Sequence, residues 1–557
     1  MYKNIFSQRN LIIIILLVAA FLRLWKLGTI PPHLTSDEAA LGYNAYSILK
    51  TGKDEYGKIF PIVFKSFGDY KTGFYIYLTV PTVAVFGLNE FSVRLPSALL
   101  GVLAVLLIYL IVKEFKVERN LEILAPALLA INPWHIHFSR GAWETNASLT
   151  LTLLGIYFFL KSLKSAKFII LSSFFFSLTI LTYQGSKLAT TIVVLILIIV
   201  FRKEVRDLFT LKKREILVSL SVGLIICLPI IASLFQGRVG RLGIYSIFSY
   251  PRKESSLQVF LDQGKEKVGG INYYIFHSES LNFTRAILGR WFNHFSGRFL
   301  FFEGDWQNPR HSSPNQGMML LFDLVLLLAG SVALTRYRSR LVKFTILWLI
   351  AAPLPAALSR DQVHAVRALN MVIPLILISS LGLTFLLGKI NKFSIWSKRF
   401  SYAFIISGLL LSLIYYLESY FVHLSKHESD LWNYGYRQIV ESVTPLENKY
   451  ENIKIQQSFA QPYIYFLFYQ KYDPEKYQRQ AKLTESEYKG DVGYIEHLDN
   501  ICFCAIDWPQ NKKEHGTLVV ADKIRIPDVE LSGESVNLIK EIKFLNGDVA
   551  FRIVEVK

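Results

Sequence analysis

Long apolar runs separated by short basic stretches dominate this chain of 557 residues. A helix needs about 20 mainly apolar residues to cross the hydrocarbon core of a bilayer. Candidate spans lie at residues 11–27, 92–112, 121–138, 146–162, 168–185, 188–201, 215–234, 318–335, 341–358, 367–388 and 401–421. The pattern predicts an α-helical polytopic membrane protein with about 11 spans.

The basic residues between the runs predict the orientation. Lys3 and Arg9 precede the first run, and further Lys and Arg clusters lie within 113–119, 161–167, 202–214, 336–343 and 389–399. All of these fall on the cytoplasmic side if residues 72–88, a short apolar run with Pro81 in its middle, do not span. We therefore expect 72–88 to be an interfacial or re-entrant element of an outer loop, and the C-terminus to lie outside. With no small-residue cleavage site after it, the first run is expected to remain as an anchor.

The charge balance fits a membrane protein. The formal net charge is +18 and 52% of the residues are hydrophobic. The basic loops are explained by orientation, so no nucleic-acid partner is predicted. Membrane lipid is an expected partner, since a basic balance suits anionic headgroups or a phosphate-bearing substrate.

The tail differs in composition from the rest. Residues 453–459 and 516–526 favour strands, 541–545 and 549–556 favour a hairpin around Asn546-Gly547-Asp548, and 462–469 favour a helix. We expect a transmembrane domain at 1–423, with outer loops 28–91 and 235–317, and a small extracytoplasmic α/β domain at 424–557. A disulfide between Cys502 and Cys504 is not expected, because alternate residues of a strand seldom pair comfortably.

The predicted orientation brings acidic residues to the outer face. Asp37 and Glu38 follow the first span, and Glu144 lies in a later outer turn. A carboxylate here could act as a general base toward a hydroxyl or amine, bind a divalent cation, or simply be solvated. Glu144 could be a second acid oriented by Arg140, or the two could form an ordinary ion pair.

Cations on the outer face need an explanation in a chain whose other basic clusters lie inside. Lys71, Lys187 and Arg367 are among them, with Arg360 and His364 in the same turn as Arg367. A bound phosphate would explain the group, and ordinary loop charge is the alternative. His135 and His137 form an H-x-H pair without a further ligand cluster, so no metal site is predicted there.

These groups together predict an outward-facing pocket for a lipid-linked phosphate donor. Cations would stabilise the leaving phosphate while a carboxylate activates the acceptor. Two other functions stay open. One is a transporter or flippase of lipid-linked sugars, which should show internal repeats and charges at mid-span. The other is a non-catalytic membrane scaffold whose outer tail binds a partner.

The order of these motifs resembles a known family. Ser36-Asp37-Glu38-Ala39, then Lys71 before an aromatic run, then the Arg94-Leu95-Pro96-Ser97-Ala98 stretch, looks like the protein O-mannosyltransferase and aminoarabinose transferase family. These are integral-membrane, C-type (GT-C) glycosyltransferases that use polyprenyl-phosphate sugars. The resemblance covers about the first 200 residues and is lost in the tail. It departs at Lys71, because many members have an acid before this lysine and two prolines after it.

The resemblance implies roles for individual residues. Asp37 matches the catalytic acidic position, Glu38 is its motif neighbour, and Glu144 falls where a second acid is usual. Lys71 matches the lysine that contacts the lipid phosphate. The long outer loop would add further basic groups, and the phosphate-binding set becomes Lys71, Arg140, Lys187, Arg298, Arg310, His311 and Arg367.

The expected reaction is inverting transfer of a hexose or pentose at the outer face of the cytoplasmic membrane. The acceptor would be a protein, lipid or glycan. No metal site is assigned, and a divalent cation at Asp37 and Glu38 is the only cofactor left open.

Overall fold

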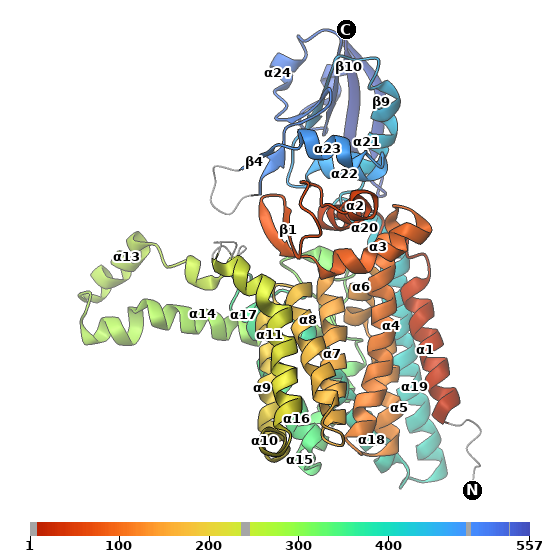
Figure 1. The fold of residues 1–557 in the computed structure, drawn as a ribbon, viewed down its shortest axis with the longest axis vertical. Helices are drawn as coiled ribbons and strands as arrows, with labels where there is room; N and C mark the ends of the chain where they lie inside the picture. The colour runs from red at the N-terminus through yellow and green to blue at the C-terminus, as the bar shows by residue number, and fades with distance from the viewer. Residues whose placement is uncertain (1–7, 236–244, 486–491, 534) are drawn as a thin grey trace.

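The computed structural model describes residues 8–235, 245–485, 492–533 and 535–557. Figure 1 shows a bundle of long helices with a smaller sheet-containing domain beyond one end. We call the end of the bundle next to this domain the domain end.

Every apolar run predicted as a span is helical. The bundle consists of α1 (Gln8–Leu24), α4 (Glu90–Glu114), α5 (Arg119–Ile131), α6 (Pro133–Arg140), α7 (Glu144–Ser162), α8 (Phe168–Thr182), α9 (Ser186–Val200), α11 (Lys213–Phe235), α15 (Asp323–Arg336), α16 (Arg340–Ala351), α17 (Leu354–Ala357), α18 (Val372–Ile390) and α19 (Ile395–Glu418). The run 121–138 is split because Asn132 caps α6, accepting from His135 N at 2.9 Å, and Pro133 occupies its first turn.

Length and apolar composition together select five helical stretches of the described chain as span candidates. They are Glu90–Glu114, Lys213–Ser233, Arg340–Ala357, Leu369–Ile390 and Ile395–His427, and shorter apolar helices lie at Phe74–Phe86, Phe168–Thr182 and Ser186–Val200. The helical polytopic class is confirmed. The count of about 11 spans stays a prediction, since several of the predicted runs form helices shorter than a full span.

The loop that follows α1 forms a compact platform at the domain end. It contains α2 (Ser36–Thr51), the hairpin β1 (Val63–Ser66) and β2 (Asp69–Thr72), and α3 (Phe74–Phe86). Phe67 and Gly68 connect the strands with φ of 51° and 82°, the backbone of a two-residue hairpin turn. Figure 1 shows α3 lying across the end of the bundle rather than along it, in keeping with the interfacial element expected at 72–88.

The C-terminal domain is a six-stranded mixed sheet in the order β6-β7-β3-β8-β10-β9. Its strands are β3 (Asn452–Gln456), β6 (His497–Leu498), β7 (Ile501–Cys504), β8 (Thr517–Ala521), β9 (Val536–Lys543) and β10 (Val549–Val556), and a separate pair is formed by β4 (Leu483–Thr484) and β5 (Tyr494–Ile495). The helices are α20 (Leu424–His427), α21 (Tyr436–Val443), α22 (Pro462–Tyr469), α23 (Pro474–Gln480) and α24 (Trp508–Asn511). The two predicted strands, the hairpin and the helix at 462–469 are confirmed.

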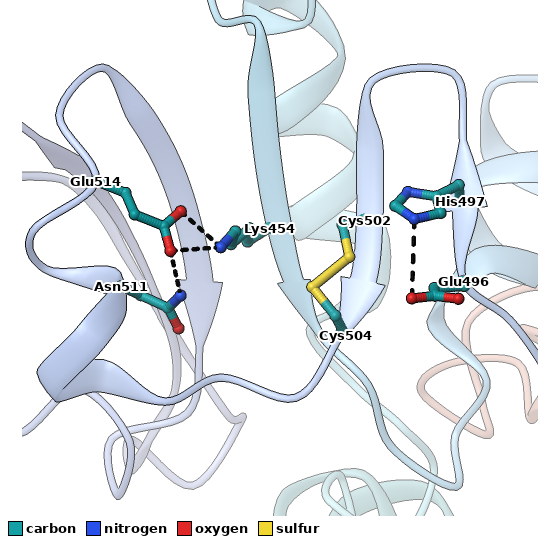
Figure 2. The surroundings of a disulfide bond; sticks show 7 residues. All are labelled: Lys454, Glu496, His497, Cys502, Cys504, Asn511 and Glu514. Atoms are coloured by element: carbon teal, nitrogen blue, oxygen red, sulfur yellow. Dashed lines mark hydrogen bonds and ion pairs between the residues drawn. A yellow bond between two sulfur atoms is a disulfide. The ribbon is translucent and has the colours of Figure 1, made fainter.

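The expectation about the cysteines is wrong. Cys502 and Cys504 form a disulfide within β7, next to β3 with its Lys454–Glu514 ion pair (Figure 2). Side chains two residues apart in a strand point to the same face, and here the Cα atoms are 5.6 Å apart, within the range that a disulfide spans.

The platform and the C-terminal domain share one hydrophobic core. Tyr43 of α2 and Phe64 of β1 belong to the same buried cluster as the aromatic residues of α22. The Tyr43 hydroxyl donates to Tyr472 O at 3.1 Å, and the Tyr465 hydroxyl donates to Leu34 O at 3.3 Å. Helix α2 is therefore held between the bundle and the C-terminal domain.

Candidate active site

The start of α2 separates its two adjacent carboxylates. The sequence Thr35-Ser36-Asp37-Glu38 is a capping box, in which Thr35 Oγ1 accepts from Glu38 N at 3.2 Å and Glu38 Oε2 accepts from Thr35 N at 3.0 Å. Neighbouring helical residues point about 100° apart. The Asp37 side chain is 60% exposed, whereas Glu38 turns inward.

Glu38 is buried in a network that joins three segments. Its carboxylate accepts from Arg94 Nε at 3.0 Å and from Ala142 N at 2.9 Å. Arg94 is itself fully buried and also donates to Pro31 O at 2.9 Å and His33 O at 2.6 Å. These bonds occupy the Glu38 carboxylate, so Glu38 fixes the position of α2 against α4.

Asp37 meets Lys71, the lysine singled out in the sequence. The Lys71 ammonium, on β2, forms an ion pair with Asp37 Oδ1 and lies 5.3 Å from the centre of the Phe67 ring. Burial lowers the pKa of Lys71, but the carboxylates of Asp37 and Glu144 outweigh burial, so the pKa lies above its usual value. Lys71 is thus a cation held next to the candidate base.

Glu144 and Asn44 line the same small cavity as Asp37 and Lys71. Asn44 is held in place by Glu55, which accepts from Asn44 Nδ2 at 3.0 Å and donates its backbone N–H to Asn44 Oδ1 at 3.0 Å. Glu55 is completely buried, and burial raises its pKa to about 8 against the opposing effect of the Asn44 hydrogen bond. The structure therefore brings Asp37, Lys71 and Glu144 together.

A larger cavity of about 420 Å³ is lined by Asp69 of β2 and by residues of the α8–α9 turn. Its polar lining includes Asp69, Tyr183, Gln184, Lys187, Tyr245 and Arg367. Gln184 Nε2 donates to Tyr70 O at 3.0 Å, which ties the α8–α9 turn to the strand that carries Lys71. Lys187 and Arg367 thus border a common space, and their role in binding a phosphate stays a prediction.

Two more predicted residues lie beside Trp143, the residue before Glu144. His311 packs edge-on against Trp143 with ring centres 5.4 Å apart, and the Arg310 guanidinium lies 6.0 Å from the Trp143 ring. His311 Nδ1 is hydrogen-bonded to Asp305 Oδ2 at 2.9 Å. The hydrogen bond to Asp305 fixes the orientation of the His311 ring beside Trp143.

Arg140 and Arg298 have other partners. Arg140 is fully buried against α1 and donates to Leu22 O at 2.9 Å, Trp25 O at 2.7 Å and Ile30 O at 2.9 Å. Arg298 pairs with Glu303 at 2.6 Å and stacks on Trp306. Arg140 is therefore a structural anchor between α6 and α1, and the structure does not bring it to the cavities.

The divalent-cation position that the sequence left open at Asp37 and Glu38 does not have converging ligands, because the two carboxylates point to different partners. Among the described residues, Asp305, His311 and His364 could offer three ligand atoms within 4.8 Å of one another. The Asp305 carboxylate already accepts from His311 and, at 2.8 Å, from Ala365 N. The Asp305 carboxylate therefore has hydrogen-bond donors from the protein itself.

An apolar groove of about 350 Å³ runs along the bundle between α8, α9, α10 (Arg202–Leu211) and α11. Its lining is mainly aliphatic and aromatic, with Phe176 and Ile180 on α8 and Leu195 on α9. Helices α8 and α9 also form the turn at Tyr183–Lys187, so the same two helices serve the groove and the polar cavity.

Sequence reasoning missed several residues of the site. Arg94 was noted only as part of a motif, and Asn44 and Glu55 were not noted. The Thr35–Glu38 capping box was a readable signal that Glu38 turns inward. The Phe67-Gly68 pair between two short apolar-polar runs was a signal for the hairpin.

The part of the chain that carries this site matches a known protein family. Residues 13–245 match the family model of dolichyl-phosphate-mannose-protein mannosyltransferases. The resemblance to the protein O-mannosyltransferase family is confirmed. The matched region contains α2, β2 and the start of α7, and with them Asp37, Lys71 and Glu144. A comparison with curated protein sequences finds no match.

Two solved structures share the fold along most of the chain. ArnT from Cupriavidus metallidurans bound to undecaprenyl phosphate is 12% identical, with 98% of each chain covered and a TM-score of 0.51. The Archaeoglobus fulgidus oligosaccharyltransferase tethered with an acceptor peptide is 12% identical, with 92% of this chain and 68% of that chain covered and a TM-score of 0.52. The chain has the GT-C membrane fold with a C-terminal domain.

Proposed function

We propose that this protein is a membrane glycosyltransferase that moves one sugar, a hexose or pentose, from a polyprenyl-phosphate donor to an acceptor outside the cytoplasm. The observation that carries the proposal is the Asp37–Lys71 ion pair in a cavity shared with Glu144. It puts a candidate base beside a candidate phosphate-binding cation, which is what displacement of a sugar phosphate requires.

Asp37 is the proposed general base. Its exposed carboxylate takes the proton from the acceptor hydroxyl or amine as that group attacks the anomeric carbon. The bond between this carbon and the phosphate oxygen breaks, and polyprenyl phosphate leaves with the electron pair. Attack opposite the leaving group inverts the anomeric configuration.

Lys71, Lys187 and Arg367 are the proposed phosphate-binding cations. Lys71 lines the cavity that holds Asp37, and Lys187 and Arg367 line the cavity that Asp69 of the same strand borders, so positive charge is available in both. Preorganised charges of this kind stabilise the developing negative charge on the leaving oxygen. Arg310 and His311 lie beside Trp143, the residue before Glu144.

The donor is proposed to extend its prenyl chain into the apolar groove along α8, α9 and α11. ArnT, which shares the fold, is bound to undecaprenyl phosphate, and this supports a donor of the same class. The proposed acceptor is a protein, a lipid or a glycan. By the positive-inside pattern, the domain end faces outside the cytoplasmic membrane.

The test uses purified protein in liposomes with a labelled sugar on either polyprenyl phosphate or a nucleotide. Acceptor peptides, lipids and glycans are supplied at the domain end. We expect label to reach an acceptor only from the polyprenyl-phosphate donor, with one polyprenyl phosphate released per sugar. Transfer from the nucleotide sugar would overturn the donor class. Movement of intact labelled lipid across the bilayer would favour the transporter.

A further inference from the structure

Residues 245–296 form a helical arm that projects sideways from the bundle close to the domain end (Figure 1). The arm contains α13 (Glu254–Gly264), the helical turn Tyr273–His277 and α14 (Glu279–Asn293). Its axis runs roughly across the direction of the bundle helices, as Figure 1 shows. The proposed reaction does not use it.

The arm exposes large apolar side chains along its length. Among the described side chains of the turn Tyr273–His277 and of α14, none is buried, and in α13 only Leu261 is. Val268, Ile271, Tyr274, Ile275, Phe276 and Phe292 are each more than half exposed. A large exposed apolar surface of this kind indicates a site that contacts another molecule or a membrane rather than a solvent-facing surface.

Contacts within the arm are few. Phe248 packs edge-on against Phe283 at 5.2 Å, Arg252 N donates to Glu279 at 3.1 Å, and His277 lies 3.3 Å from Glu266. A helix of 15 residues with no buried face is marginal in water. Something else must therefore cover the apolar side chains.

The base of the arm contacts a helix that is apolar enough to span a membrane. Trp291 Nε1 donates to Ile350 O at 2.8 Å, and Ile350 lies within the span candidate Arg340–Ala357. Helix α11, which precedes the arm in the chain, exposes Leu217, Leu224 and Ile225 on another span candidate that is only 22% buried. The arm is thus joined to one span candidate by a hydrogen bond and follows another, largely exposed one in the chain.

The polar residues of the arm suit the boundary between lipid and water. Arg252, Lys253, Lys265, Lys267 and Arg285 are interspersed with the aromatic side chains. Tyr and Trp favour the headgroup level, and basic side chains favour lipid phosphates.

We propose that the arm is a membrane-interfacial lipid-binding element, lying in the leaflet at the domain end with its exposed apolar side chains among the lipids. The arm also contacts the bundle near the proposed active site. Arg290 Nη2 donates to Arg360 O at 2.9 Å, in the turn that leads to Arg367. The arm is thus linked to the turn that precedes Arg367, a residue that lines the larger cavity.

The test measures the environment of single spin labels on the full chain in nanodiscs of phosphatidylcholine and phosphatidylglycerol. Cys227→Ser removes the free thiol, and Cys502 and Cys504 stay disulfide-bonded. Labels go to Ile271→Cys and Phe276→Cys on the arm. Leu224→Cys on α11 serves as the lipid reference and Lys523→Cys in the C-terminal domain as the water reference.

We expect the spin labels at positions 271 and 276 to be several-fold more accessible to oxygen than to a water-soluble nickel complex. The lipid reference at 224 should behave in the same way, and the water reference at 523 should show the opposite preference. The nickel-accessible pattern of 523 would overturn the proposal. Shielding from both reagents would also overturn it and indicate a protein partner. Unsubstituted protein provides a second readout, because a photoactivatable phospholipid should cross-link to residues 254–293, and no cross-link there contradicts the proposal.

Discussion

Lys71 and Asp37 form an ion pair between β2 and the first turn of α2. In the proposed reaction this ion pair would be rearranged. When a donor phosphate binds, Lys71 gains a second anion, and Asp37 can turn its carboxylate to the acceptor. The pair therefore links donor binding to activation of the base.

Replacing Lys71 should weaken donor binding. Lys71→Met removes a charge-assisted contact to phosphate that contributes about 1.5–3 kcal/mol, so the Kd for polyprenyl phosphate should rise by at least about tenfold. Lys71→Arg should keep part of the affinity. The matched control is Lys65→Met on β1, whose ammonium lies over the Tyr56 ring. Equal affinities for the Lys71→Met and Lys65→Met proteins would remove Lys71 from the phosphate site.

The Arg94–Glu38 pair should be essential for stability. Both side chains are buried, with 0% and 5% exposed, and loss of one partner leaves an unpaired buried charge. Arg94→Ala should cost about 3–5 kcal/mol in the free energy of unfolding, seen as a large fall in the apparent Tm. Lys476→Ala breaks the exposed Lys476–Asp499 pair and should cost less than about 1 kcal/mol. Similar Tm values for the two variants would mean that the buried network does not hold α2.

Gly42 should tolerate no side chain. A Cβ there would lie 2.6 Å from Phe468 Cε2 and 2.6 Å from Val93 Cγ2, because α2 is squeezed between α22 and α4. Gly42→Val should lower both the apparent Tm and the transfer rate, since a shift of α2 moves Asp37. Gly388→Ala in α18 is the control, as its added Cβ meets no atom within 4 Å. A fully active, stable Gly42→Val protein would show that α2 packs more loosely than described.

Glu55 should make stability depend on pH. The pKa of Glu55 is about 8 in the folded protein, whereas the ordinary value for a glutamate is 4.5. Between pH 4.5 and about 8, the folded protein therefore holds a proton that the unfolded chain has lost. Stability should therefore fall as the pH rises from about 4.5 to about 8, and level off above that. Glu55→Gln should flatten this part of the curve of apparent Tm against pH, and Glu451→Gln, at an exposed position, should leave it unchanged. A Glu55→Gln curve with the unsubstituted slope would assign the pH dependence to other groups.

The sequence predicted the helices well because their signal is local. Each apolar run became a helix, and the hairpin around Gly547 followed from its turn residues. Asp37, Lys71 and Glu144 were found from charges on a predicted outer face and from a family resemblance. They meet because α2, β2 and α7 all begin or end at the domain end.

The errors concern tertiary packing. Arg140 was assigned to the cavity from its place in a turn, yet its side chain is buried among carbonyls of the α1 end, which no local pattern reveals. Glu38 was grouped with Asp37 among the candidate catalytic acids, although one helical step turns it toward Arg94. The Cys502–Cys504 disulfide was judged from general strand geometry rather than from the approach of these two side chains.

Transfer of labelled sugar by the Asp37→Asn protein in liposomes tests the central claim most directly. We expect transfer to fall by about 10²–10⁴-fold while donor Kd stays near that of the unsubstituted protein, because Asn keeps the shape of Asp37 but cannot take a proton. Asp499→Asn, in the C-terminal domain, should transfer normally. Unchanged transfer by Asp37→Asn would contradict the account and move the base to Glu144.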